Sequence, residues 1–221
     1  MKITGAIFDM DGTLIDSLGF WDQLWATLGE KYRNDKTFRP DPVTEKGGRT
    51  STIKGAAKLI HENCRMGENA EEIEILFEDM LGRYYMEVVE MKPGMRELLE
   101  LFLKNGVKMC VASATSPNLL KMIMDKFGFR RYFPKVISCL EVGKGKEHPD
   151  VFIAAHEYLG TDKDTTWIFE DSTVALSTAV KAGFNTVGIY DKYNFGIDKV
   201  KEFSTVFVDK GEMAAEVLCI K

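Results

Sequence analysis

The chain has 221 residues, of which 45% are hydrophobic and 29% charged, a balance typical of a globular protein with one core or a core carrying a smaller insertion. Its formal net charge of −5 argues against nucleic acid or an anionic membrane surface as the main partner. The four cysteines form no CxxC pair, so we expect neither a zinc site nor a disulfide framework. The first apolar run is too short for a signal peptide, and no run reaches membrane-spanning length, so we expect a cytoplasmic protein.

The first predicted strand, residues 3–8, leads directly into two acidic side chains, Asp9 and Asp11. Side chains alternate along an extended segment, so both carboxylates should point to the same side at the carboxyl end of the strand. Gly12 then permits a tight change of direction. Two carboxylates this close repel each other unless a cation lies between them, so the stretch predicts a bound metal. The competing interpretation is a strand followed by an acidic turn.

Residues 16–91 show helical periodicity, which predicts three or four helices without a strand. Asp16 or Ser17 is expected to cap the first helix, and the glycine-containing stretch 47–51 is expected to be a loop that leads into another. Asn69 is expected to start the last helix of this block through a capping-box-like pattern. The apolar face of that last helix is expected to comprise Ile73, Leu76, Phe77, Met80, Tyr84 and Val88.

From residue 92 onward, strands alternate with helices, which predicts an α/β fold with a doubly wound, Rossmann-like parallel sheet covered on both faces. The opening strand finds no partner strand in the helical block and must pair with later strands. We therefore predict a catalytic core of residues 1–15 and 92–221, with residues 16–91 inserted as an α-helical cap. The later strands are expected at 107–112, 135–138, 166–169, 186–189 and 205–208, and helices at 117–127, 150–159 and 172–182.

Further polar clusters follow the later strands, where ligands bind in open parallel sheets. Ser113, Ala114 and Thr115 offer hydroxyl and backbone N–H groups that can bind phosphate oxygens, although a helix cap would look the same. Lys144 and Lys146 lie in a glycine-containing loop, where a lysine can neutralise a phosphate or remain a solvated surface charge.

The last cluster is Glu170, Asp171 and Ser172, which follows the apolar run 167–169. Asp171 can complete a magnesium site made of oxygen ligands, and Ser172 can cap the next helix. The competing interpretation is a capped helix start with an acidic first turn.

The order of acid pair, hydroxyl, lysine and acid, each after a separate predicted strand, resembles the haloacid dehalogenase-like phosphohydrolases over essentially the whole chain. Residues 9–14 are similar to the first motif of that family, Ser113 to the second, Lys146 to the third and residues 170–172 to the fourth. The sequence at 146–150 is similar to the family's Lys-Pro-x-Pro-Asp pattern, but the proline after the lysine is absent here. The helical block resembles the family's small α-helical cap.

The resemblance implies a magnesium-dependent phosphatase that hydrolyses a small phosphorylated metabolite, such as a sugar phosphate, through an aspartyl-phosphate intermediate. Asp9 would attack phosphorus, and Asp11 would protonate the leaving oxygen and later activate water, with its backbone carbonyl on the metal. Ser113 and Lys146 would hold and neutralise the transferring phosphate. The residues implied to hold Mg²⁺ are Asp9, Asp11, Glu170 and Asp171, and those implied to bind substrate are Arg49, Ser113, Ala114, Thr115 and Lys146.

Specificity is expected to lie in the cap, where Arg49, in a glycine-flanked loop, is the best candidate for contacting the rest of the substrate. Trp21 and Trp25 could line the cleft, but aromatic residues at helical spacing are more often cap core.

Two other functions compete with a phosphatase. A sugar-phosphate mutase resembling β-phosphoglucomutase would carry a histidine early in the cap, where this sequence has Trp21. A non-catalytic phosphometabolite-binding protein would have lost catalysis, against which the intact acids and lysine argue. We expect a monomer or a weak dimer with no nucleic-acid or membrane partner.

Overall fold

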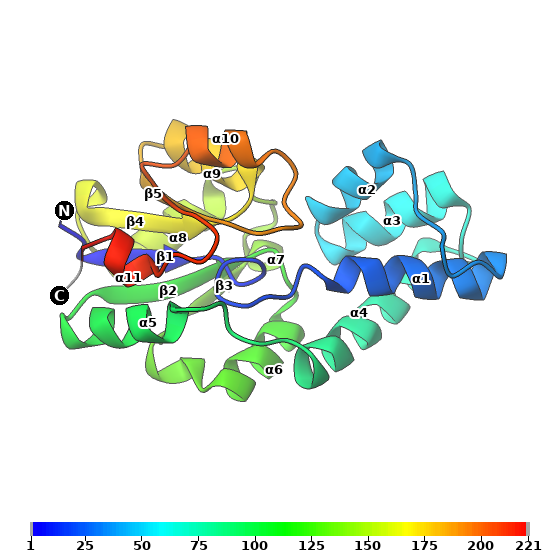
Figure 1. The fold of residues 1–221 in the computed structure, drawn as a ribbon, viewed down its shortest axis with the longest axis horizontal. Helices are drawn as coiled ribbons and strands as arrows, with labels where there is room; N and C mark the ends of the chain where they lie inside the picture. Colours follow the sequence, from blue (N-terminus) through cyan, green and yellow to red (C-terminus); the bar gives the residue numbers. More distant parts are fainter. Residues whose placement is uncertain (1, 220–221) are drawn as a thin grey trace.

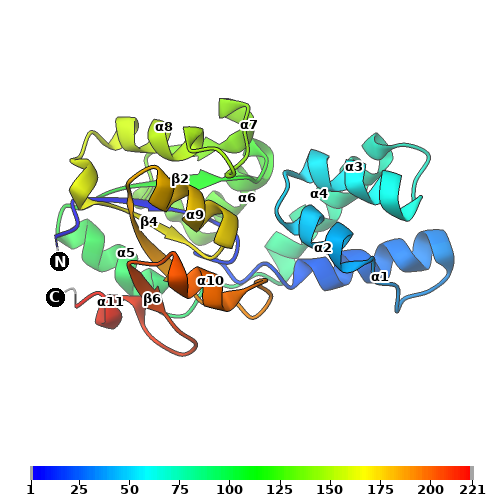
Figure 2. The ribbon, with the colours of Figure 1, turned by 90° about the horizontal axis from the view of Figure 1, so that it is seen from above.

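The computed structural model describes residues 2–219, which form a six-stranded parallel sheet with helices on both faces (Figures 1 and 2). The strand order is β3-β2-β1-β4-β5-β6, so the predicted doubly wound α/β fold is confirmed. The strands are β1 (Gly5–Phe8), β2 (Lys108–Ser113), β3 (Val136–Ser138), β4 (Thr166–Glu170), β5 (Asn185–Ile189) and β6 (Val206–Val208).

The opening strand β1 lies at the centre of the sheet, between β2 and β4, as predicted from its lack of a local partner. Its alternating side chains enter two separate cores. Phe8 packs with α5 (Met95–Lys104) and α6 (Pro117–Phe127), which Figure 1 shows below the sheet. Ile7 packs on the opposite face with helices α8 (Asp150–Leu159) and α9 (Thr173–Lys181). The remaining core helices are α7 (Cys139–Val142), α10 (Ile197–Glu202) and α11 (Ala214–Val217).

Four helices lie together at one end of the sheet, on the right in Figure 1. They are α1 (Phe20–Arg33), α2 (Pro42–Arg49), α3 (Ile53–Cys64) and α4 (Ala70–Glu87). The two chain segments that join them to the sheet run side by side, because Asp16 N–H donates to Glu90 O and Lys92 N–H donates to Leu14 O, each at 2.9 Å. We propose that residues 16–91 form a cap that these paired segments join to the core.

The first cap helix begins later than predicted. Neither Asp16 nor Ser17 caps it, and α1 begins at Phe20 with Gly19 at the N-cap position. The Ser17 hydroxyl instead donates to a carboxylate oxygen of Asp11 at 2.7 Å. Ser17, which the sequence predicts to be a helix cap, therefore contacts Asp11 instead.

The prediction of a loop at residues 47–51 is wrong for residues 47–49, which belong to α2, whereas residues 50–51 lie in the short connection to α3. Asp41 caps this helix by accepting from the N–H groups of Val43 and Thr44, at 3.0 and 3.1 Å. A Cβ at Gly48 would lie 3.3 Å from the Trp21 ring, so this glycine permits close packing between helices.

The last cap helix, α4, starts as predicted, with Asn69 accepting from the Glu72 N–H at 2.9 Å. The predicted apolar face is wrong near the C-terminal end of α4. Tyr85 is fully buried there, whereas Val88, which was predicted to be buried, is 54% exposed. The real apolar face shifts by one residue toward Leu81 and Tyr85.

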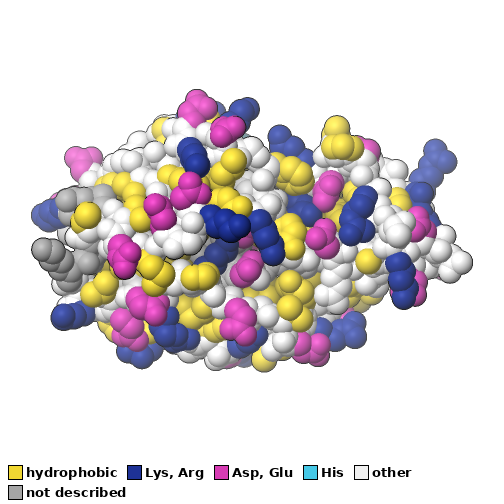
Figure 3. Space-filling view, in the orientation of Figure 1, with side chains coloured by type: hydrophobic (Ala, Val, Ile, Leu, Met, Phe, Trp, Pro, Cys, Tyr) yellow, Lys and Arg dark blue, Asp and Glu magenta, His cyan; other side chains and the backbone are white. Residues whose placement is uncertain are grey.

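Neither the cysteines nor the charged side chains visible in Figure 3 show an unusual arrangement among residues 2–219. All four cysteines are free, and Cys110 is a fully buried core residue. Figure 3 shows acidic and basic side chains mixed over one face. Within residues 2–219, none of the helices combines the length and apolarity needed to cross a membrane.

Candidate active site

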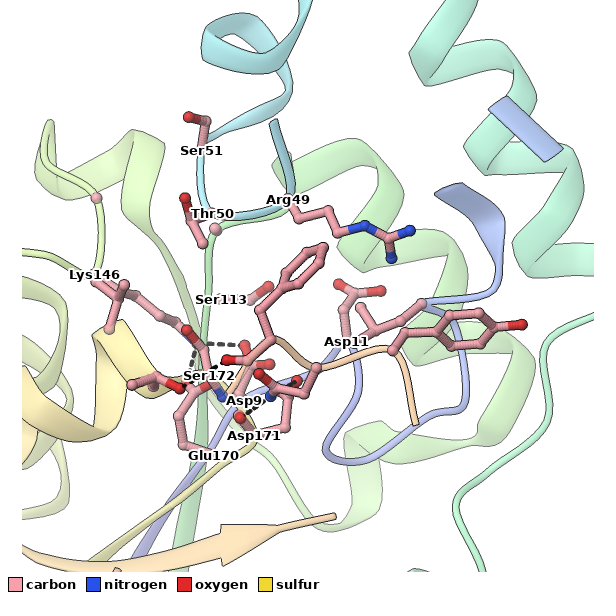
Figure 4. Close-up of a pocket in the computed structure, with 18 of the residues that line it drawn as sticks. Asp9, Asp11, Arg49, Thr50, Ser51, Ser113, Lys146, Glu170, Asp171 and Ser172 are labelled. Atoms are coloured by element: carbon pink, nitrogen blue, oxygen red, sulfur yellow. Dashed lines mark hydrogen bonds and ion pairs between the residues drawn. The ribbon is translucent and has the colours of Figure 1, made fainter. Parts of the chain in front are cut away.

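A cavity of about 720 Å³ opens between the carboxyl ends of the central strands and the cap helices. Figure 4 shows acidic residues and Lys146 at its base and Arg49 on the cap side. Every predicted site residue lines this one cavity: Asp9, Asp11, Arg49, Ser113, Ala114, Thr115, Lys146, Glu170 and Asp171. The four clusters, which are far apart in the sequence, therefore meet in one place.

Lys146 lies at the base of the cavity between two carboxylates. Its Nζ donates to Asp9 Oδ1 and, at 2.6 Å, to Glu170 Oε2. Burial alone would lower the pKa of Lys146, but the charges of Asp9 and Glu170 outweigh it, and the pKa is raised. The other Glu170 oxygen accepts from the Ser172 N–H at 3.1 Å, so Glu170 also fixes the start of the loop before α9. Lys146 is thus held as an ammonium ion beside Asp9.

Three buried acids, Asp9, Glu170 and Asp171, each present an oxygen within 4.8 Å of the other two. Burial and the charge of Glu170 raise the pKa of Asp9 from 3.8 to about 8, against the opposing effect of Lys146. Burial, Glu170 and Asp9 raise the pKa of Asp171 well above its usual range. One ammonium ion does not balance three carboxylates. The all-oxygen donor set and its excess negative charge fit a hard divalent cation such as Mg²⁺.

Asp171 is held by contacts from two other loops. Its Oδ1 accepts from the Thr13 hydroxyl and its Oδ2 from the Asn194 amide, each at 3.2 Å. Gly12 makes this approach possible, because its φ is +86° and a Cβ there would lie 2.6 Å from Asp171 Oδ2. The glycine of the first motif therefore permits the turn and also leaves room for the fourth motif.

The Asp11 carboxylate faces away from the three acids and accepts hydrogen bonds from three hydroxyl groups. Ser17 and Tyr85 donate to Oδ1 at 2.7 and 2.6 Å, and Thr115 donates to Oδ2 at 2.7 Å. Its side chain is not among the group that could hold a metal. The prediction that Asp11 contributes its backbone carbonyl to a metal stays a prediction.

Ser113 ends β2 and is 1% exposed, with its Oγ accepting from the Thr115 N–H at 3.1 Å. The Thr115 carbonyl accepts from the Ser138 hydroxyl at 2.8 Å, which ties this turn to β3. Because Thr115 gives its hydroxyl to Asp11, Ser113 is the better placed of the two for a phosphate oxygen.

Arg49 lies at the C-terminal end of α2, which corrects its predicted place in a loop at a helix start. Its side chain is only 9% exposed, and Nη2 donates to Glu45 at 2.8 Å. The guanidinium lies 5.5 to 5.8 Å from the ring centres of Trp21, Tyr193 and Phe195. Nε and Nη1 are buried without a hydrogen-bond partner among the residues described, and Arg49 is one of the residues that line the cavity. Trp25 is fully buried, whereas Trp21 also lines the cavity.

Several residues that support the site could not be predicted from the sequence. Tyr85 contacts Asp11 from the cap, and Asn194 contacts Asp171 from the loop after β5. That loop is held by a buried ion pair, in which Lys92 Nζ donates to Asp191 at 2.5 Å. None of these residues lies in a recognisable motif, since each is brought to the site by the fold.

The chain was compared with models of known protein families. The family model that matches is the haloacid dehalogenase-like hydrolase model, over residues 3–183. The chain belongs to this family. Membership confirms the predicted resemblance and makes the protein an enzyme of the hydrolase class, as predicted.

Named relatives and solved structures agree with this placement. A phosphorylated carbohydrates phosphatase of Thermotoga maritima is 24% identical, over 86% of this chain and 87% of its own length. Hexitol phosphatase B of Escherichia coli is 27% identical, over 84% of this chain and 83% of its own length. The structure of CbbY from Rhodobacter sphaeroides in complex with phosphate has the same fold, with a TM-score of 0.80 at 18% identity and 96% coverage of both chains.

Proposed function

We propose that this hydrolase is a magnesium-dependent phosphatase that releases orthophosphate from a small phosphorylated carbohydrate through a phosphoaspartate at Asp9. The observation that carries the proposal is the meeting of Asp9, Lys146 and Asp171 at the base of one cavity. The carbohydrate class rests on the two phosphatases named above. We further propose that the protein works in the cytoplasm as a monomer or weak dimer.

Asp9, Asp171 and Glu170 are the side chains that would hold Mg²⁺, together with the backbone carbonyl of Asp11. When bound, the ion supplies positive charge that offsets the repulsion between the carboxylates and a phosphate. The crowding that raises the pKa of Asp9 and of Asp171 is the physical reason why the site needs a cation.

The chain's own residues supply the remaining chemistry. A carboxylate oxygen of Asp9 attacks phosphorus as Asp11 gives a proton to the leaving oxygen. Lys146 offsets charge on the transferring group, and Ser113 holds one of its oxygens in line. Asp11 then takes a proton from the water that attacks phosphorus, and orthophosphate and free Asp9 result.

The rest of the substrate would occupy the cap side of the cavity. The unpartnered nitrogens Nε and Nη1 of Arg49 can donate to hydroxyl or anionic oxygens, and a planar guanidinium held against aromatic rings presents them in a fixed orientation. A substrate that occupies both the base and the cap side would close the cap over itself and exclude water.

Hydrolysis is favoured over the mutase alternative by the lining of the cavity. Among the described residues that line it there is no histidine, and Trp21 lines it from the cap, where the resemblance to the mutase implies a histidine. The non-catalytic alternative would not require an ammonium ion placed against Asp9, which is the contact a phosphoryl-transfer site needs.

The direct experiment is orthophosphate release from a panel of phosphorylated sugars, sugar alcohols and small organic acids, with and without Mg²⁺. We expect turnover of at least one carbohydrate phosphate by the wild type, and none by Asp9→Asn. Asp79→Asn, a change at a cap carboxylate that is 61% exposed, is the matched control and should keep full activity. Conversion of β-glucose 1-phosphate to glucose 6-phosphate without orthophosphate would support the mutase instead. A ligand that raises the melting temperature without turnover would support the binding protein.

A further inference from the structure

The three hydroxyls around Asp11 come from three separate parts of the chain. Ser17 lies in the segment that leads into the cap, Thr115 follows β2, and Tyr85 projects from cap helix α4. Two of them, Ser17 and Tyr85, share Oδ1, while Thr115 takes Oδ2. The orientation of the carboxylate is therefore fixed jointly by the core and the cap.

Tyr85 is the one of these three donors that lies on a cap helix, α4. Its ring is fully buried, so the packing around it holds the hydroxyl in one place beside Asp11. At neutral pH a tyrosine carries its hydroxyl proton, and this one is donated to Asp11 Oδ1 at 2.6 Å. Tyr85 thus serves as a permanent donor to Asp11.

The turn that carries Tyr85 is attached to the core. Lys126, on α6, donates to the carbonyl oxygens of Tyr85 and Val89, both at 2.6 Å. An ammonium ion at the C-terminal end of a helix also interacts favourably with the helix dipole. At Gly82, a Cβ would lie 3.4 Å from Leu119 of α6, so the two helices pack closely there. This end of α4 is therefore fastened to α6 of the core.

We propose that Tyr85 is a positioning residue for Asp11, held by Lys126 so that a cap helix sets the orientation of the proposed acid and base. The inference rests on the proposed function, because it takes Asp11 as the group that protonates the leaving oxygen. Tyr85 need not touch the substrate. Its hydroxyl fixes the Asp11 carboxyl so that the proton passes along a short, aligned path as the bond between phosphorus and the leaving oxygen breaks.

The test compares Tyr85→Phe with Tyr84→Phe on two simple esters, phenyl phosphate and 4-nitrophenyl phosphate. Phenolate is the more basic leaving group and needs the proton more. A hydrogen bond to a charged group has a free energy that corresponds to roughly 10- to 100-fold in rate. We expect Tyr85→Phe to lose about that factor in kcat for phenyl phosphate, with KM little changed. The first turnover of 4-nitrophenyl phosphate, followed as the initial release of nitrophenolate, should be far less affected.

Tyr84 is the control because it neighbours Tyr85 in the same helix and contacts Phe20 rather than Asp11. Equal losses on both esters for Tyr85→Phe, or equal behaviour of the two variants, would overturn the inference. A crystal structure of Tyr85→Phe gives a second measurement that needs no activity: the inference requires the Asp11 carboxylate to change its orientation, and an unmoved carboxylate contradicts it. Asp11→Asn is measured alongside. If that variant keeps full activity, the proposed function fails; if it is inactive while Tyr85→Phe matches the wild type, only the role of Tyr85 fails.

Discussion

Removing the charge of Asp9 should stabilise the metal-free protein while it abolishes activity. Asp9 is buried among Glu170, Asp171 and Lys146, and its pKa is raised from 3.8 to about 8. The folded protein therefore holds the Asp9 proton more tightly than the unfolded chain does. Its contribution to stability is fully present below about pH 4 and is lost as the pH rises toward 8. Asp9→Asn carries no ionisable group at this position and escapes that loss.

The magnitude follows from the width of this pH window. Each pH unit inside it removes about 1.4 kcal/mol from the free energy of unfolding, because only the unfolded chain has lost the proton. Between pH 5 and pH 7 the wild type should therefore lose about 3 kcal/mol more than Asp9→Asn. In saturating Mg²⁺ the ion stabilises the ionised carboxylates, and the difference between the two proteins should largely disappear.

Urea denaturation at pH 5 and pH 7, in EDTA and again in Mg²⁺, measures this difference directly. Asp79→Asn is the control, since its exposed carboxylate should change stability little at either pH. If the wild type and Asp9→Asn respond identically to pH in EDTA, Asp9 does not carry the unfavourable charge that the site geometry implies.

Three further changes test other parts of the site. Gly12→Ala should abolish Mg²⁺-dependent activity, because its Cβ would lie 2.6 Å from a carboxylate oxygen of Asp171, whereas Gly106→Ala, with a similar φ of +69° and open space, should cost only about 1 kcal/mol of stability and keep its activity. Arg49→Lys should raise KM about tenfold with kcat little changed, since a lysine keeps the charge but loses the planar donor pair; an unchanged KM would remove Arg49 from substrate binding. Lys92→Met should lower the free energy of unfolding by about 3 kcal/mol in urea denaturation, because it leaves a buried aspartate without its cation, and a change below about 1 kcal/mol would contradict that.

Elements with strong local signals were predictable from the sequence. The helices at 117–127 and 150–159 have the predicted bounds, because Pro117 starts the first, and Gly128 and Gly160 end the two in left-handed conformations. The acids were predicted because they follow buried strands, and parallel strands bring their carboxyl ends to one edge of the sheet. Lys146 was predicted from its resemblance to the family's Lys-Pro-x-Pro-Asp pattern. That the four clusters share one cavity is a consequence of this topology.

Features that depend on tertiary contacts were not predictable. The two glycines in α2 indicate a loop locally, but Gly48 is needed where Trp21 packs against the helix. Ser17 reads as a helix cap because nothing in the sequence shows that Asp11 will lie beside it. Tyr85 was missed because residues 84 and 85 are both tyrosines, and the helical pattern does not show which of them is buried. The packing of α4 against α6 decides that it is Tyr85.

The measurement that tests the central claim most directly is a search for phosphate on Asp9. The wild type is mixed with Mg²⁺ and 4-nitrophenyl phosphate, quenched in acid within the first turnover, digested, and analysed by mass spectrometry with and without hydroxylamine. The proposed mechanism predicts one added phosphoryl group on the peptide that contains Asp9, which survives acid and is removed by hydroxylamine, as expected for an acyl phosphate. Full hydrolysis with no phosphorylated peptide, or a phosphoryl group on a different residue, would contradict it.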